Sequence, residues 1–177
     1  MILGVDIDDT ITYTTRTIKK YLKQLYPDYD EYKNLPRKEY LHFLKKYMKQ
    51  MRSEYELREG VKEAWEYFRK NHYKIIFITA RNNKYYRESN QDTLEYLRQN
   101  GLFYDKIYFN EPKKGKRAKR MYVDLFVDDK EVILDHMSAY GIKGICMGKS
   151  ERYPSFDNWY QIIDYLEEVN HGRGEDT

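Results

Sequence analysis

Short apolar runs alternate along this chain with longer segments in which apolar residues recur at helical spacing. The helical spacing is clearest where Val61, Ala64, Trp65 and Phe68 fall on one face. The apolar runs predict five strands, at residues 2–6, 74–79, 106–109, 125–128 and 143–147. Strands that alternate with helices are typical of a parallel sheet wrapped by helices. The pattern therefore predicts an α/β fold, closed by a last helix over residues 157–169.

The alternation is interrupted between the first two strands, where residues 13–72 contain more than one crossover helix. Ile18, Leu22 and Leu25 form one apolar stripe, and positions 41, 44, 48, 51 and 55 form a second. We predict that residues 15–58 are a small helical cap that lies over the strand ends and shields them from water. The alternative is a helical hairpin packed on one face of the sheet. Residues 1–14 and 59–170 then form the core, and residues 171–177 a flexible tail.

Composition bears on the compartment and on membrane partners. The single cysteine, Cys146, excludes an intramolecular disulfide and favours a reducing compartment, so we expect a cytoplasmic protein. No apolar stretch approaches the roughly 20 residues that span a bilayer. Residues 1–5 are too short for a signal peptide and lack basic flanks. We therefore expect no membrane partner.

The positive charge of the chain is local. The formal net charge is +3, but six basic residues fall within positions 113–120. Without these six, acidic residues are in excess. This distribution indicates one basic patch and argues against a surface that coats nucleic acid nonspecifically.

Carboxylates follow the first predicted strand directly, at Asp6, Asp8 and Asp9, with Thr10 beside them. If the strand alternation continues, Asp6 and Asp8 point in the same direction. Two like charges at one strand end repel unless a cation or a proton lies between them. Because open α/β sheets bind ligands at the carboxyl ends of their strands, this motif favours a metal-assisted site.

Two more polar clusters follow strands that end at the same edge of the predicted sheet. The strand at 74–79 ends in Thr79, and the strand at 125–128 ends in Asp128, followed by Asp129. A lysine-rich segment that begins at Lys113 lies between them in the sequence. Carboxylates for a divalent cation, with a hydroxyl and a lysine for an oxyanion, are the groups that phosphoryl transfer requires.

In this order and spacing the motifs resemble those of the haloacid dehalogenase-like phosphohydrolases. The resemblance rests on Asp6-Ile7-Asp8-Asp9-Thr10, on Thr79, on a downstream lysine and on Asp128-Asp129. It implies a Rossmann-like three-layer core with a parallel sheet of about five strands and a cap inserted after the first strand. It also implies a magnesium-dependent phosphatase.

The resemblance implies a role for each carboxylate. Asp6 would be the nucleophile that accepts the phosphoryl group, and Asp8 the general acid and base, with a pKa raised by burial and by the Asp6 charge. Asp6, the backbone carbonyl of Asp8, and Asp128 would bind Mg²⁺. Asp129 and Thr10 would support the site, Asp129 by orienting a metal-bound water or the lysine.

Phosphate contacts are expected from Thr79, the backbone amide of Ala80 and one lysine. Lys114 is the lysine we favour, because it precedes Gly115 at the start of a short predicted helix. Lys113, Lys116 and Lys119 are alternatives.

The sequence departs from the commonest family pattern at Asp9, where glycine often precedes the threonine. This departure, and the Thr93–Leu97 and Tyr104–Ile107 stretches, resemble the 5'(3')-deoxyribonucleotidase and nucleotidase branch. The resemblance implies a small phosphorylated substrate such as a nucleoside monophosphate, whose base one of the many cap tyrosines could stack on. The alternatives are a polynucleotide-end phosphatase, with nucleic acid as partner, and a non-catalytic binding or regulatory protein. The sequence does not indicate an oligomeric state.

Overall fold

The sheet of this protein contains six parallel strands. The structure, a computed structural model, describes residues 1–172. Its strands lie in the order β3-β2-β1-β4-β5-β6. Their bounds are β1 Ile2–Val5, β2 Lys74–Ile78, β3 Lys106–Tyr108, β4 Leu125–Asp128, β5 Lys143–Met147 and β6 Ser155–Phe156. The predicted α/β, Rossmann-like core is confirmed, with one strand more than expected, because two-residue β6 is too short to produce an apolar run.

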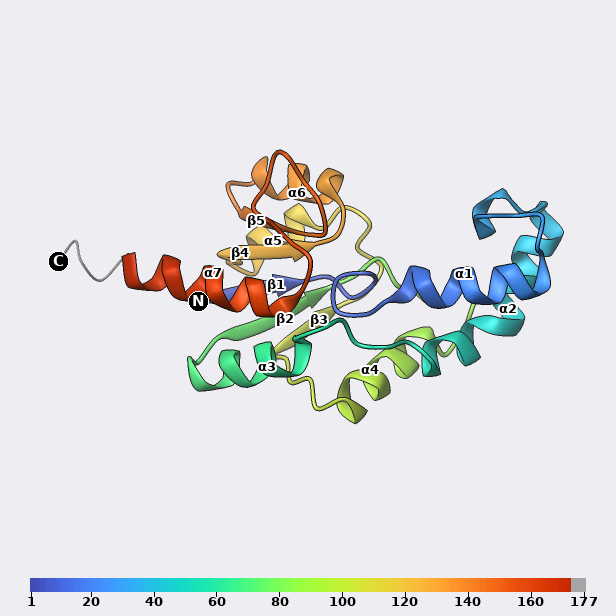
Figure 1. Cartoon of the computed structure of the whole chain (residues 1–177), viewed down its shortest axis with the longest axis horizontal. Coiled ribbons are helices and arrows are strands. Elements are labelled where there is room, and N and C mark those ends of the chain that lie inside the picture. Colours follow the sequence, from blue (N-terminus) through green and yellow to red (C-terminus); the bar gives the residue numbers. More distant parts are fainter. Residues whose placement is uncertain (173–177) are drawn as a thin grey trace.

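Side chains of the central strands alternate between two apolar layers. Ile75 and Phe77 face one layer, whereas Ile76 and Ile78 face the other. This is the period-2 alternation of a strand that is buried on both faces. Helices α3 (Val61–Lys70), α4 (Ser89–Gln99) and α7 (Trp159–Gly172) cover the first face, and α5 (Gly115–Arg120) and α6 (Glu131–Ser138) cover the second (Figure 1).

Helix α7 differs in its bounds from the helix predicted at residues 157–169. It begins at Trp159, whose ring is fully buried and whose Nε1 donates to the carbonyl of Thr10 at 2.9 Å. It extends to Gly172, so the first two residues of the predicted tail are helical. The remainder of that tail lies outside the described residues. Among residues 1–172, no helix combines the length and apolar character needed to cross a bilayer.

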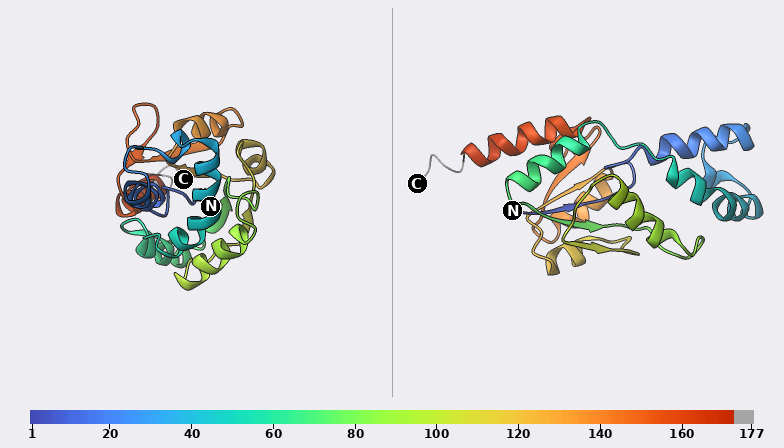
Figure 2. Two further views of the ribbon diagram at one scale, coloured as in Figure 1. Left: turned by 90° about the vertical axis from the view of Figure 1, so that its right-hand side faces the viewer. Right: turned by 90° about the horizontal axis from the view of Figure 1, so that it is seen from below.

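Helices α1 (Thr14–Leu25) and α2 (Arg37–Ser53) and the short η1 (Tyr32–Asn34) contain most of the cap, residues 15–58. They lie beyond the carboxyl ends of the strands, at the end of the molecule opposite the N terminus (Figures 1 and 2). This position differs from that of a hairpin packed on a sheet face. The cap has its own apolar cluster, formed by Ile18, Tyr21, Leu22, Leu35, Phe43, Leu44, Met51 and Tyr55.

Two antiparallel connections join the cap to the core. Tyr13 donates its amide to the carbonyl of Glu56 at 2.9 Å, and Arg58 donates its amide to the carbonyl of Ile11 at 2.9 Å. Thr12 and Leu57 pair between these two bonds. The backbone therefore enters and leaves the cap side by side, directly after the first carboxylate motif.

Candidate active site

Asp6 follows β1 directly and is held by the backbone. Its amide donates to the carbonyl of Val127 at 3.0 Å, which continues the pairing of β1 with β4. That pairing brings the first residue after β1 beside Asp128, the last residue of β4. Both carboxylates are buried. The parallel register thus places two acidic side chains from distant parts of the sequence together at one edge.

Lys114 lies between these two carboxylates. Its Nζ is 2.6 Å from Oδ1 of Asp6 and 2.6 Å from Oδ2 of Asp128. Of the four candidate lysines only Lys114 is buried, whereas Lys113, Lys116 and Lys119 are exposed. Gly115 makes this placement possible, because a Cβ there would lie 2.6 Å from the carbonyl oxygen of His136. Helix α5 can therefore approach α6 closely enough to direct the preceding lysine into the site.

Asp129 adds a third carboxylate to the pair. Carboxylate oxygens of Asp6, Asp128 and Asp129 all lie within 4.8 Å of one another. Oδ1 of Asp129 is buried and has no hydrogen-bond partner among residues 1–172. Oxygen ligands of this kind are those that a hard divalent cation such as Mg²⁺ prefers. The residues present therefore fit a magnesium ion, and the unpartnered oxygen of Asp129 is the clearest sign of it.

The electrostatics of this cluster favour binding of a cation. Burial first, and then the charges of Asp128 and Asp8, raise the pKa of Asp6 to about 6, although Lys114 opposes the shift. Burial, together with the neighbouring Asp128 and Asp6, raises the pKa of Asp129 to about 7 despite the opposing charge of Lys130. Two lysines, Lys114 and Lys130, do not fully compensate three close carboxylates. A divalent cation would complete the compensation.

Asp8 is paired with an arginine rather than with a lysine. Arg81, which is buried, donates from Nη2 to Oδ1 of Asp8 at 2.6 Å and from Nε to Oδ2 at 3.0 Å. Thr14 Oγ1 donates to the same carboxylate at 2.8 Å. Burial raises the pKa of Asp8, but the charge and hydrogen bonds of Arg81 outweigh it, so the pKa lies below its usual range. The expectation of a raised pKa was wrong, because the sequence reasoning did not identify Arg81 as its partner.

Asp9 and Thr10 lie in the turn that follows β1. Asp9 has φ +56°, the left-handed region that glycine favours, which accounts for the glycine common at this position. Its carboxylate accepts hydrogen bonds from the amide and hydroxyl of Thr15 in α1. The strand ends at Val5, so strand alternation does not set these directions as expected. Thr10 is buried, and its hydroxyl has no partner among residues 1–172.

Thr79 and Ala80 follow β2 at the same edge of the sheet. Thr79 is buried, and its hydroxyl oxygen accepts a hydrogen bond from the amide of Arg81 at 3.2 Å. The hydroxyl proton is therefore directed elsewhere and can be donated to an anion. Ala80 is exposed and lines a cavity of about 230 Å³ together with Asp8 and Arg81.

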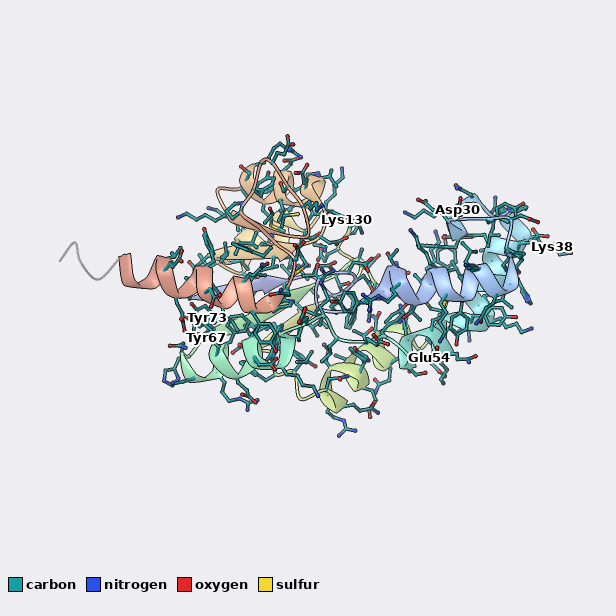
Figure 3. All side chains as sticks on the ribbon, viewed as in Figure 1. Asp30, Lys38, Glu54, Tyr67, Tyr73 and Lys130 are labelled. Atoms are coloured by element: carbon teal, nitrogen blue, oxygen red, sulfur yellow. The ribbon has the colours of Figure 1, made fainter. Side chains whose placement is uncertain are left out.

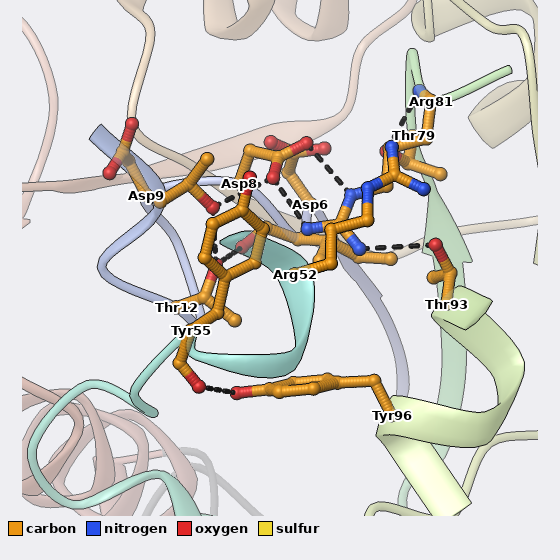
Figure 4. A network of polar contacts seen from close by, with 12 residues as sticks. Asp6, Asp8, Asp9, Thr12, Arg52, Tyr55, Thr79, Arg81, Thr93 and Tyr96 are labelled. Carbon is orange, nitrogen blue, oxygen red and sulfur yellow. Dashed lines mark hydrogen bonds and ion pairs between the residues drawn. The ribbon is translucent and has the colours of Figure 1, made fainter. Parts of the chain in front are cut away.

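A larger cavity, of about 370 Å³, separates the cap from the core. Asp8, Asp129 and Lys130 line it from the core, and Arg52 and Tyr55 line it from residues 15–58. Figure 3 shows Lys130 on the core and Asp30, another lining residue, on the cap. Figure 4 shows Tyr55 and Arg52 close to Asp8. The cap thus contributes side chains to the same cavity as the carboxylate motifs.

The structure brings together most of the residues that the sequence singled out. Asp6, Lys114 and Asp128 are in direct contact, Asp129 joins them, and Asp8 lies close enough to influence the pKa of Asp6. The sequence analysis assigned no role to Arg81, Arg52 or Lys130. The sequence did contain a signal for Arg81, since an arginine two positions after a strand-terminal threonine lies at the same edge of the sheet as the carboxylates. It contained no signal for Arg52, because the position of Arg52 depends on how the cap packs over the core.

Known structures share this fold over nearly the whole chain. A HAD-superfamily hydrolase from Geobacter sulfurreducens is 16% identical, with a TM-score of 0.66 over 93% of this chain and 95% of that one. A HAD-hydrolase from Bacillus subtilis bound to magnesium is 15% identical, with a TM-score of 0.62 over 94% and 98%. A phosphoserine phosphatase is 13% identical, with a TM-score of 0.64 over 93% and 98%. No protein-family model matches the chain, and no curated protein matches it significantly in sequence. The similarity shows the fold of the HAD-superfamily hydrolases.

Proposed function

We propose that this chain is a magnesium-dependent phosphomonoester hydrolase that forms an aspartyl-phosphate on Asp6. The observation that carries the proposal is the buried contact of Lys114 with Asp6 and Asp128, next to the unpartnered oxygen of Asp129. Two structures of the same fold support it: one is a phosphoserine phosphatase and the other is bound to magnesium.

In the first step, a carboxylate oxygen of Asp6 attacks phosphorus and the ester P–O bond breaks. The hydroxyl of Thr79, the amide of Ala80 and the ammonium of Lys114 hold the phosphoryl oxygens. Asp6, Asp128 and the carbonyl of Asp8 would hold Mg²⁺, with Asp129 and Thr10 in support. Bound Mg²⁺ supplies neutralisation of the phosphate charge. Water then attacks phosphorus, releases inorganic phosphate and regenerates Asp6.

Asp8 is the proton-transfer residue of the proposal. Its contact with Arg81 keeps it ionised, which suits it to accept the proton of the attacking water in the second step. In the first step the leaving oxygen needs a proton. Asp8 can supply that proton only if substrate binding weakens its contact with Arg81. Arg81 is therefore a positioning residue, because its contact with Asp8 sets the protonation state of that carboxylate.

A small substrate fits the cavity between the cap and the core. Its volume of about 370 Å³ lies in the range of small-molecule sites, which is about 300–1,000 Å³. A nucleoside monophosphate, which the sequence resemblance favours, is one such substrate, and this narrower choice stays a prediction.

Hydrolysis of nitrophenyl phosphate by the purified protein, with Mg²⁺ and with EDTA, tests the proposal. We expect turnover only with Mg²⁺, and a loss of at least about 10⁴-fold in Asp6→Asn, the scale on which a lost nucleophile lowers kcat. Asp164→Asn makes the same chemical change on the exposed face of α7 and is the matched control. Magnesium-independent turnover, or an equal loss in both variants, would contradict the proposal.

A further inference from the structure

The cavity between the cap and the core contains an arginine that no carboxylate neutralises. Arg52 lies near the end of α2 and donates from Nη1 to both the carbonyl and the hydroxyl oxygen of Ser89, at 2.7 Å each. Its Nε is buried and has no acceptor among residues 1–172. Arg52 also forms no ion pair with any carboxylate among residues 1–172. A half-buried guanidinium with an unused donor is costly to maintain without an anion.

Charges next to Arg52 leave an excess of positive charge. Asp8 is already paired with Arg81 through two hydrogen bonds, and Arg52 lies close to the same carboxylate (Figure 4). Asp92, the other carboxylate that acts on Arg52, accepts the hydroxyl of Tyr86 and forms no ion pair with Arg52. Burial first, and then repulsion by Arg81, lower the pKa of Arg52 from its usual value, although the charges of Asp8 and Asp92 oppose the shift. An anion in the cavity would relieve this repulsion.

Charges at the mouth of the same cavity are mixed in sign. Lys19 and Lys33 line it, but so do Asp30 and Glu31, and all four are exposed. A surface that follows a phosphate backbone would carry one sign along its length. The mixed mouth and the single unpaired arginine inside it therefore favour a small anionic group over a polyanion.

We propose that Arg52 binds a second anionic group, a carboxylate or a second phosphate, on the part of the substrate that leaves. This inference rests on the proposed phosphatase function and narrows its substrate class. Arg52 and Asp8 line the same two cavities, so one small molecule can reach from the core side to the cap side. The planar guanidinium suits a carboxylate or phosphate, which it can bind through two parallel hydrogen bonds.

The alternative is that Arg52 has only a structural role and attaches the cap to the start of α4 through Ser89. Lys49 provides the comparison, because it lies on the same helix and pairs with Glu88 at 2.8 Å, one residue before Ser89. Lys49 is exposed and lies outside the two cavities that contain Asp8. Lys49→Met therefore weakens the attachment of the cap to α4 but leaves the positive charge of Arg52 in the cavity.

The test compares phenyl phosphate with carboxyphenyl phosphate, which differ only in the carboxylate. We expect the wild type to prefer the carboxylate ester by at least about 10-fold in kcat/KM, the effect of one charge-assisted pair. Arg52→Met should abolish the preference, Arg52→Lys should retain part of it, and Lys49→Met should retain it fully. A preference that survives in Arg52→Met, or one that is lost equally in Lys49→Met, would overturn the inference.

Binding of the corresponding phosphonates separates this inference from the proposed function. Phenyl phosphonate and carboxyphenyl phosphonate are not turned over, and calorimetry measures their affinity in the presence of Mg²⁺. Tighter binding of the carboxylated compound by the wild type, lost in Arg52→Met, supports the subsite even if neither ester is hydrolysed. Failure of hydrolysis alone refutes the phosphatase. Equal affinities of the wild type for the two phosphonates refute the role of Arg52.

Discussion

Two regions of the candidate site differ in what fixes them. Around Asp6, the ends of β1 and β4 and the segment before α5 place every charged group, and parallel pairing sets the distances. Around Asp8, the groups come from the start of α1, from the cap and from the segment that follows β2. The contacts of both arginines join segments that are far apart in the sequence. The first region has too few cations for its carboxylates, and the second has too few anions for its guanidinium groups. Together they suit a substrate held by a divalent cation at one end and an arginine at the other.

Removing Lys114 should show how strongly the first region depends on compensation of its charges. Lys114→Met leaves Asp6 and Asp128 buried without their cation, and breaking a buried pair in this way costs about 3–5 kcal/mol of unfolding free energy. Lys116→Met, two residues away and exposed, should change it by no more than about 0.5 kcal/mol. Urea unfolding in EDTA measures both variants. Similar urea midpoints for Lys114→Met and Lys116→Met would contradict a buried contact of Lys114 with Asp6 and Asp128.

Asp8→Asn tests the second region through kinetics. A general acid matters most when the leaving oxygen is basic, so we expect a loss of about 10²–10⁴-fold in kcat/KM with an alkyl phosphate. With nitrophenyl phosphate, whose leaving group departs without a proton, the loss should be much smaller. Steady-state kinetics across a series of leaving groups measures the difference. An equal loss across the series would assign Asp8 to structure or metal binding instead.

The pH dependence of stability should also report on the first region. The pKa of Asp6 is raised from 3.8 to about 6 and that of Asp129 from 3.8 to about 7. Their contribution to stability without a divalent cation is therefore complete below pH 3.8 and is lost as the pH rises through 6 and 7. Mg²⁺ binds the ionised carboxylates, so it should raise Tm more at pH 8 than at pH 5.5, by about 2–4 °C for each kcal/mol of binding free energy.

Thermal melts of the wild type and Asp129→Asn, with Mg²⁺ and with EDTA, check this expectation. Asp129→Asn should be the more stable protein in EDTA at pH 8 and should gain less from Mg²⁺. A magnesium effect that is equal at both pH values, or unchanged in the variant, would show that these carboxylates do not bind the ion.

Salt concentration should have the smallest effect on kcat/KM. Its effect distinguishes a phosphatase that acts on small molecules from one that acts on nucleic-acid ends. Helix α5 presents exposed Lys116, Lys119 and Arg120 to solvent, as a polynucleotide-end phosphatase would need. If only the two regions above bind substrate, kcat/KM for a mononucleotide should fall by less than about 10-fold between 50 and 200 mM salt. Rates for a mononucleotide and a phosphorylated oligonucleotide at both concentrations check this. Preference for the oligonucleotide, with a loss of about 10³-fold or more over this range, would favour the nucleic-acid alternative.

The sequence could predict the first region because short local patterns encode it. Apolar runs located five of the six strands to within one residue at each end, including the three strands, β1, β2 and β4, that end at the carboxylate and hydroxyl motifs. The carboxyl ends of parallel strands meet at one edge of the sheet. Even Lys114 could be favoured, since it precedes the glycine that starts α5. The proximity of Asp6 and Asp128 is tertiary, yet it follows from the register of β1 and β4.

The second region could not be predicted, because the arginine contacts that define it join segments far apart in sequence. Arg81 meets Asp8 across 73 positions, and Arg52 meets Ser89 across 37. Strand alternation, which was used to orient Asp8 and Asp9, does not apply past Val5, where the chain turns toward α1. The pKa of Asp8 was therefore expected to shift in the wrong direction. A side chain whose partner comes from a distant segment needs the folded structure for its charge state to be assigned.

Trapping the phosphoryl group on the protein tests the central claim most directly. Wild type and Asp8→Asn are mixed with substrate and Mg²⁺, quenched in acid during turnover and mapped by mass spectrometry of peptides. We expect a phosphoryl group on the peptide that contains Asp6, in greater amount in Asp8→Asn because hydrolysis of the intermediate is slowed, and none in Asp6→Asn. Turnover by a folded Asp6→Asn protein, or a phosphoryl group on any other residue, would contradict the account.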